Sequence, residues 1–157
     1  MIQSKLMTTL TRSISNVLET MFFLPIRVEE DDPAIDEWMQ AVSNPVGAQI
    51  GFTGPFSGQA FFILSENVVM EMTANFLGLS QEEATSDQQQ DTLKEALNMI
   101  AGHMLSLYDT KGEIQLGIPE LMTADDITDT KQSSISDNTL LIATENSRMI
   151  SGIVAAD

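Results

Sequence analysis

Apolar residues recur at helical spacing in two long stretches of the chain, residues 1–22 and residues 87–108. Within each stretch they follow one another at intervals of three or four residues, which places them on one face of a helix. The first helix is expected to end near Leu24, because a residue that precedes proline avoids the helical region. The repeating positions are Leu6, Leu10, Ile14, Val17 and Met21 in the first stretch, and Leu93, Leu97, Ile100, Met104 and Leu107 in the second.

Alternating and β-rich segments lie between and after these helices. Residues 25–30 predict a short strand, and residues 46–53 and 59–64 predict a hairpin that turns through a Gly-Pro-Phe-Ser-Gly segment. Residues 66–77 predict a third helix closed by Gly78. Residues 113–118 predict a strand stopped by Pro119, and residues 139–144 and 149–155 predict a second hairpin.

Three segments have weaker patterns. The stretch around Trp38, before Pro45, is either a short helix or a loop. Residues 80–83 have the form of a capping box, but this polar run also fits a linker into the next helix. Residues 120–137 are polar and acidic, and Met122 and Ile127 are expected to anchor them to the core.

The order of these elements predicts two related halves. Helix, strand, hairpin and helix in residues 1–78 are followed by helix, strand and hairpin in residues 79–157. The pattern favours one domain over residues 1–157, of the α/β class in its α+β form, with a mostly antiparallel sheet covered by long helices. The alternative to two related halves is that the two amphipathic helices are unrelated, since a helix followed by a hairpin is a common arrangement.

Composition narrows the class of partner. The chain has 157 residues, of which 43% are hydrophobic and 19% charged, which is typical of one domain with its own core. Its net charge of −16 repels phosphate backbones and anionic bilayers, so we expect no nucleic-acid and no membrane partner. The same charge favours a protein partner with a basic rim.

The chain has no cysteine, which excludes thiol nucleophiles, thiolate metal sites and disulfides. Its first residues lack a continuous apolar core and a cleavage site of the kind that signal peptides have. No stretch reaches the roughly 18 apolar residues that a membrane-spanning helix needs. These observations together predict a cytoplasmic location.

Asp91, Glu95 and Asn98 are the candidate functional residues. At about 100° per residue they project within roughly 60° of one another and almost opposite the apolar stripe of residues 93–107. The stripe must face the core, so the three polar side chains are expected to face outward, where they can meet a partner. The alternative is an ordinary solvated helix face, because short motifs often match by chance.

The first helix carries a related spacing. Ser15, Glu19 and Phe22 repeat the intervals of Asp91, Glu95 and Asn98, and they are predicted to lie opposite the apolar face of their helix. Phe22 stands where the second copy has the amide. It is expected either to cover the first strand or to belong to an exposed patch used for self-association.

These features together resemble the CheC/CheX/FliY family of chemotaxis phosphatases. The shared features are the outward D/S-x-x-x-E-x-x-N motif, the proline that follows it and the duplicated helix-and-hairpin architecture. Members of the CheX type carry one active motif, and the chain looks most like them, because Asp91, Glu95 and Asn98 match the motif whereas Phe22 lacks the amide. Pro119 lies a couple of residues closer to Asn98 than the family pattern has it. The resemblance implies a CheC-like fold and a homodimer.

The resemblance also implies a function, namely hydrolysis of the phosphoaspartate on a phosphorylated CheY-like response regulator. Asn98 would orient the attacking water, Glu95 would pair with a lysine of the regulator, and Asp91 would support the docked surface. Such chemistry depends on positioning and charge stabilisation, which a carboxamide can supply. Ser15, Glu19 and Phe22 would form a degenerate, inactive copy. The resemblance implies Mg²⁺ on the regulator and no cofactor or metal on this chain.

Other readings of the sequence have less support. His103 is expected at the boundary between core and solvent, because no Gly-x-Ser-x-Gly elbow accompanies it. Asp125, Asp126 and Asp129 lack the glycine and the terminal glutamate of a calcium loop. A non-catalytic adaptor that binds a response regulator or a flagellar motor-switch protein is the main alternative function. A structural dimer of unrelated purpose is the third.

Overall fold

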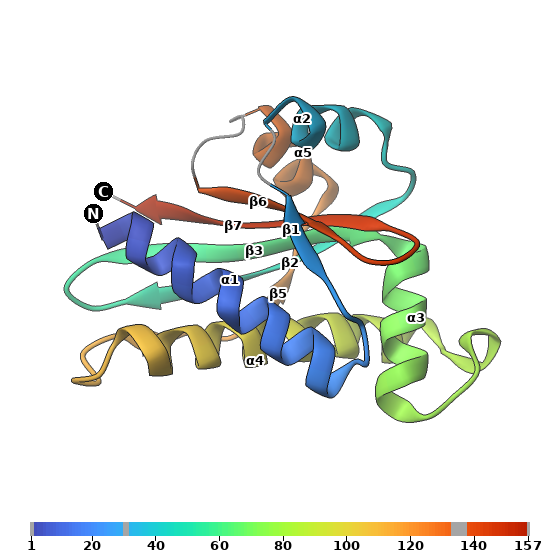
Figure 1. Cartoon of the computed structure of the whole chain (residues 1–157), viewed down its shortest axis with the longest axis horizontal. Helices are drawn as coiled ribbons and strands as arrows, with labels where there is room; N and C mark the ends of the chain where they lie inside the picture. The colour runs from blue at the N-terminus through green and yellow to red at the C-terminus, as the bar shows by residue number, and fades with distance from the viewer. Residues whose placement is uncertain (1, 30–31, 133–137, 157) are drawn as a thin grey trace.

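A computed structural model describes residues 2–29, 32–132 and 138–156 of the chain, without the side chains of residues 2, 3, 32, 131, 132, 155 and 156 (Figure 1). Helices and strands are distributed over the whole of this described part. In chain order they are α1 (Ile2–Met21), β1 (Arg27–Glu29), α2 (Asp32–Ala41), β2 (Pro45–Thr53), β3 (Ser57–Ser65), α3 (Glu66–Leu77), the 3-10 turn η1 (Gln81–Glu83), α4 (Ser86–Tyr108), β4 (Gln115–Leu116), β5 (Glu120–Leu121), α5 (Ala124–Gln132), β6 (Thr139–Ala143) and β7 (Arg148–Ala156).

The strands form one sheet in which every described pairing is antiparallel, which confirms the predicted α+β class. Its order is β1-β6-β7-β3-β2-β4, with β5 also paired to β2. The two predicted hairpins, β2–β3 and β6–β7, meet in the centre, and the edge strand beside each hairpin comes from the other half of the chain. Each edge of the sheet therefore begins with a single strand from one half, followed by the hairpin of the other half. This symmetry agrees with two related halves, although a duplication in the sequence stays a prediction.

Helices cover both faces of the sheet (Figure 1). On one face α1 and α4 pack against each other, and α3 packs beside α4. Because strand side chains alternate between faces, Ala48, Ile50 and Phe52 of β2 point to the larger core beneath these helices. On the other face α2 and α5 cover a smaller core that includes Ile35 and Ile127. The sheet thus holds α1 and α4 as a pair on one side of the molecule.

Most predicted elements are confirmed. The helix predicted at residues 66–77 has these bounds and ends on Gly78, whose φ of 71° is the left-handed conformation that glycine adopts without strain. The segment around Trp38 is helical (α2), and Ile127 is buried as predicted. Residues 81–83 form a short 3-10 turn. There the Ser80 hydroxyl and backbone N–H donate to the Glu83 carboxylate and hold its pKa below the ordinary value.

The prediction of a strand over residues 113–118 that stops at Pro119 is wrong in its extent. Pairing to β2 covers only Gln115–Leu116 and resumes beyond Pro119 at Glu120–Leu121. Between the two paired segments, residues 117–119 lie opposite residues 50 and 51 of β2, so the edge strand contains one extra residue. Such a bulge accommodates proline, which has no N–H to donate to the ladder. Helix α5, which follows, was not predicted, and among its described side chains only Ile127 is deeply buried.

No helix in the described parts of the chain has the length and apolar character needed to cross a membrane.

Candidate functional site

Helix α4 carries the motif, and its first turn is fixed by a reciprocal pair of hydrogen bonds. The Gln88 backbone N–H donates to Oγ1 of Thr85 at 3.1 Å, and the Thr85 backbone N–H donates to Oε1 of Gln88 at 3.0 Å. This capping box satisfies two of the N–H groups that a helix start leaves without an intrahelical partner. The helix therefore begins at a defined residue, a few positions before the motif.

The rotation of α4 about its axis is set by its buried side. Leu93, Leu97, Ile100 and Met104 are each at most 2% exposed and belong to the larger core. The cost of moving such side chains into water is about 1.5–3 kcal/mol each, so the helix cannot turn its apolar face outward. The packing of these apolar side chains therefore keeps the motif residues on the side of α4 that faces away from the core.

The structure places the motif residues on the outer half of α4. Asp91 and Glu95 are exposed, and Asn98 is half-buried. Asn98 lies five residues before His103, about 140° around the helix from it. Because His103 faces α1, where its Nδ1 lies 2.8 Å from Oγ of Ser13, Asn98 projects away from α1. The amide therefore lies on the flank of α4 that is turned away from α1, where it is half-buried.

Within the described residues, the side chains of Glu95 and Asn98 form no hydrogen bond and no ion pair. Asp91 differs, because its Oδ1 lies 3.8 Å from Nζ of Lys94, one turn along the helix. A carboxylate and a carboxamide that are not used within the fold keep their full capacity for a partner: two acceptor oxygens on Glu95, and a donor and an acceptor on Asn98.

The residues of α1 with the related spacing have different surroundings. On α1 the Ser15 hydroxyl donates to Oε1 of Glu19 at 3.2 Å, so these two side chains are engaged with each other. The expectation that Phe22 projects from the outer face of α1 is wrong. Helix α1 ends at Met21, and Phe22 is 0% exposed with its ring stacked on Phe76 at 4.9 Å. Helical spacing does not apply beyond the last helical residue, which is why the projection from the sequence failed.

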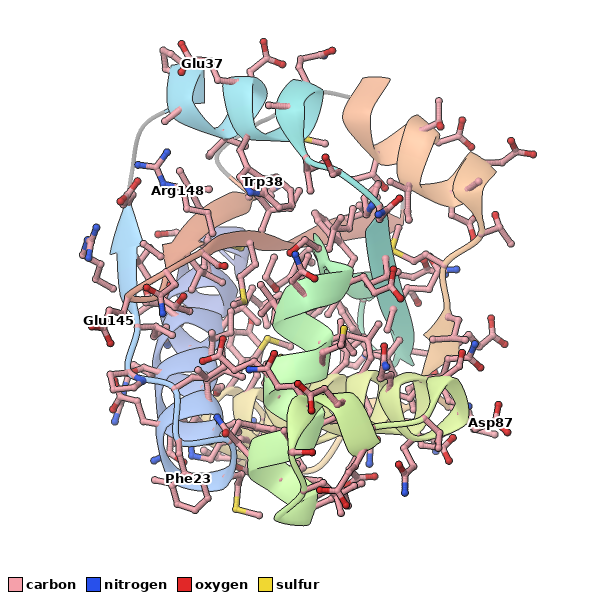
Figure 2. The ribbon with its side chains drawn as sticks, turned by 90° about the vertical axis from the view of Figure 1, so that its right-hand side faces the viewer. Phe23, Glu37, Trp38, Asp87, Glu145 and Arg148 are labelled. Carbon is pink, nitrogen blue, oxygen red and sulfur yellow. The ribbon has the colours of Figure 1, made fainter. Side chains whose placement is uncertain are left out.

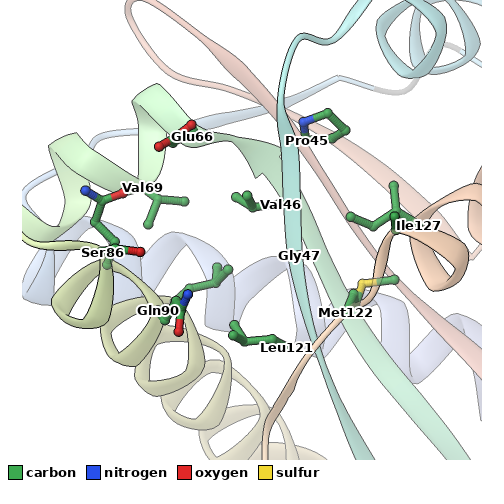
Figure 3. Close-up of a pocket in the computed structure, with 13 residues that line it drawn as sticks. Pro45, Val46, Gly47, Glu66, Val69, Ser86, Gln90, Leu121, Met122 and Ile127 are labelled. Carbon is green, nitrogen blue, oxygen red and sulfur yellow. The ribbon is translucent and has the colours of Figure 1, made fainter.

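A hollow of about 310 Å³ lies beside the N-terminal half of α4 (Figure 3). Its walls come from α3, α4, β2 and the segment from β5 to α5, and most of the lining side chains are apolar. The polar lining residues are Glu66, Ser86, Gln89 and Gln90. Of these, Gln90 lies one turn before Lys94, so the hollow adjoins the helix segment that carries the motif.

His103 and the acidic cluster of Asp125, Asp126 and Asp129 were also considered as functional residues in the sequence analysis. His103 is half-buried between α1 and α4, as predicted for a boundary residue. In the acidic cluster, Asp126 accepts from the Thr123 backbone N–H at 2.9 Å and so caps the start of α5. The described residues contain no group of three or more His, Asp or Glu side chains that could hold a metal ion.

Comparison with known proteins assigns the family. Residues 46–152 match the protein-family model described as chemotaxis phosphatase CheX. The chain belongs to the CheX family. The matched range contains Asp91, Glu95 and Asn98 and leaves out α1, which carries Ser15 and Glu19. A search of curated protein sequences gave no significant match.

Solved structures share the fold of this CheX-family chain over nearly its whole length. The chemotaxis protein CheX from Vibrio vulnificus has a TM-score of 0.74 at 17% identity, and the similarity covers 98% of each chain. CheX in a CheX–CheY–BeF₃–Mg²⁺ complex from Borrelia burgdorferi has a TM-score of 0.67 at 12% identity, with 96% of this chain and 97% of that chain covered. The FliM middle domain from Vibrio alginolyticus has a TM-score of 0.59 at 11% identity, with coverage of 98% and 92%.

Proposed function

We propose that this CheX-family chain hydrolyses the phosphoaspartate of a CheY-like response regulator. The observation that carries the proposal is the state of Glu95 and Asn98. Both lie on the outer half of a helix whose rotation is fixed by a buried apolar stripe, and neither is engaged by another described side chain. Family membership supports the reaction class, because the matching family model is that of a chemotaxis phosphatase.

The proposed chemistry requires only positioning from this chain. The Asn98 carboxamide accepts a hydrogen bond from a water molecule and aligns its oxygen with the phosphorus, opposite the acyl oxygen. The bond between water oxygen and phosphorus forms while the bond to the aspartate oxygen breaks. The aspartate leaves as a carboxylate, and the water proton goes to the inorganic phosphate. Partial burial of Asn98 restricts its rotamers, which favours a fixed water position.

In this proposal the positive charges that neutralise the phosphoryl group belong mainly to the regulator. Glu95, one turn before Asn98, pairs with a regulator lysine and fixes the register of the docked helix. The proposal also assigns Mg²⁺ to the regulator, and the Borrelia burgdorferi complex is named as containing CheX, CheY, BeF₃ and Mg²⁺ together. The homodimer implied by the family resemblance belongs to the same proposal, and light scattering of the purified chain tests it.

A second candidate function is a non-catalytic adaptor that binds a regulator or a motor-switch protein. The likeness to the FliM middle domain favours it, because that structure shares the fold over most of both chains. The two functions are separated by inorganic phosphate release from a phosphorylated CheY-like regulator with and without the chain. Release that is accelerated in proportion to the added chain supports the phosphatase. Binding of the regulator with no acceleration would reject it in favour of the adaptor.

Reversing the charge of Glu95 is expected to weaken docking. Glu95→Lys places a cation opposite the proposed regulator lysine, so KM for the phosphorylated regulator should rise about tenfold at low ionic strength. The rise should shrink as salt is added, because exposed charges are screened. Steady-state phosphate release at several regulator concentrations measures both effects.

Glu37→Lys is the matched control, since it makes the same change in net charge on α2, which covers the other face of the sheet (Figures 1 and 2). Its KM should equal that of the unaltered chain. An identical rise in KM for both variants would mean that Glu95 acts only through overall charge, and the proposed pairing would have to be abandoned.

A further inference from the structure

Lys94 is the only lysine or arginine of helix α4, in a chain with 7 basic and 23 acidic residues. Its side chain is 37% exposed, so part of its aliphatic stem is covered while the ammonium reaches the surface. The ammonium lies 3.8 Å from the Asp91 carboxylate, whose side chain is 80% exposed. The motif face of a strongly acidic molecule thus contains one cation, which lies next to the first motif residue.

The position of Lys94 relative to the motif follows from helix geometry. Lys94 lies four residues and Glu95 three residues before Asn98, at about 40° and 60° on opposite sides of it. The amide of Asn98 therefore has a cation on one flank and a carboxylate on the other, each within one turn. Sequence reasoning did not include Lys94, although its spacing of four residues from Asn98 was visible.

An approaching phosphoryl group meets an unfavourable field from this chain. A phosphorylated carboxylate carries negative charge on its phosphoryl oxygens, and the chain has a net charge of −16. Glu95 and Asp91 add negative charge on the motif face itself. Lys94 is the charge on α4 that can offset this repulsion close to Asn98.

We propose that Lys94 is a docking residue that contacts the phosphoryl oxygens of the partner and that Asp91 holds it in position, an inference that rests on the proposed function. The Asp91–Lys94 pair is exposed and therefore weak, so the ammonium can exchange a carboxylate oxygen for a phosphoryl oxygen when the partner docks. This assigns Asp91, the first residue of the motif, a positioning role through Lys94. It also makes the chain prefer the phosphorylated form of its partner.

The test compares Lys94→Gln, which removes the charge, with Lys94→Arg, which keeps it. Phosphate release at varied regulator concentration should show a KM about three- to fivefold higher for Lys94→Gln at low salt, with a smaller change in kcat. Lys94→Arg should stay near the unaltered KM. Lys111→Gln is the matched control, because Lys111 is exposed beyond the other end of α4 and should leave KM unchanged. A Lys94→Gln variant with unaltered KM, or a Lys94→Arg variant as impaired as Lys94→Gln, would overturn the proposal.

A binding measurement separates this inference from the proposed hydrolysis. The regulator is used with and without beryllium fluoride, which stands in for the phosphoryl group, and affinities are compared by titration calorimetry. The unaltered chain should prefer the loaded regulator, and Lys94→Gln should lose most of that preference. If the unaltered chain shows the preference and Lys94→Gln loses it, without any accelerated phosphate release, the phosphatase proposal fails and the Lys94 contact is supported. Equal affinity of the unaltered chain for both forms would refute the Lys94 contact even if hydrolysis is observed.

Discussion

Asn98→Ala is expected to reduce catalysed phosphate release by about 10²-fold or more, to near the regulator's own rate, because the water loses the group that aligns it. The fold should remain, since the Asn98 side chain makes no hydrogen bond to another described residue and alanine is the best helix former. KM should change little, because the proposed contribution of Asn98 is to the reaction rather than to docking. Single-turnover phosphate release at saturating chain concentration measures the effect directly.

The matched control is Asn16→Ala, which makes the same change at an exposed position within helix α1. It should release phosphate at the unaltered rate. Asn98→Asp is a second informative variant, because aspartate has nearly the same shape but has lost the N–H donors and adds negative charge next to the phosphoryl group. Full activity in Asn98→Ala would remove the amide from the mechanism, whatever the family resemblance suggests.

The elements that the sequence predicted well are those whose pattern is local and repeated. Helix α4 has a stripe of apolar residues over several turns. The hairpin of β2 and β3 has alternating faces and a Gly- and Pro-rich turn. In both cases each local preference agrees with the position of the element in the fold, so the pattern alone was sufficient.

The elements that were missed depend on contacts between distant parts of the chain. Helix α5 is mostly polar and is held by Ile127, which packs in the smaller core with residues of α2 and three strands. The edge strand around Pro119 exists because β2 offers partners on both sides of a bulge. Neither feature has a local periodicity long enough to be recognised, because tertiary contacts decide the structure of short segments.

The candidate site was partly predictable, because some of its features depend on local helical spacing and others on contacts between distant parts of the chain. The outward orientation of Asp91 and Glu95 follows from helical spacing and agrees with the structure. The partial burial of Asn98 does not follow from spacing, because it depends on how closely other parts of the fold approach the flank of α4 that is turned away from α1. The ion pair between Asp91 and Lys94 is also a feature of the structure that the sequence pattern did not indicate.

The difference between α1 and α4 explains why the two halves of the fold are not equivalent. Their helices pack side by side and carry similar spacings, but α4 continues for several turns past Asn98 whereas α1 ends one residue before Phe22. The chain then turns, with the Leu18 carbonyl accepting from the backbone N–H groups of both Phe22 and Leu24. The turn carries Phe22 into the core, away from the face that holds Ser15 and Glu19.

Phe22→Asn is therefore expected to destabilise the protein and to create no second active site, although it completes the motif in the sequence. Phe22 is fully buried, its ring stacks on Phe76, and its carbonyl accepts from Nδ2 of Asn75 at 2.9 Å. Replacing a buried aromatic ring by a small side chain costs about 3–5 kcal/mol, and an unpaired buried amide adds about 1–3 kcal/mol. Urea unfolding should show a large drop in the transition midpoint.

Phe23→Asn is the control, because Phe23 is 67% exposed and has a φ of 55°, a conformation that asparagine tolerates better than phenylalanine (Figure 2). Its unfolding midpoint should be unchanged or slightly raised. Phosphate release is then measured for Phe22→Asn combined with Asn98→Ala, where any activity must come from α1. Activity restored in that double variant would show that the amide at position 22 reaches the surface, contrary to the buried position of Phe22 and to the end of α1 at Met21.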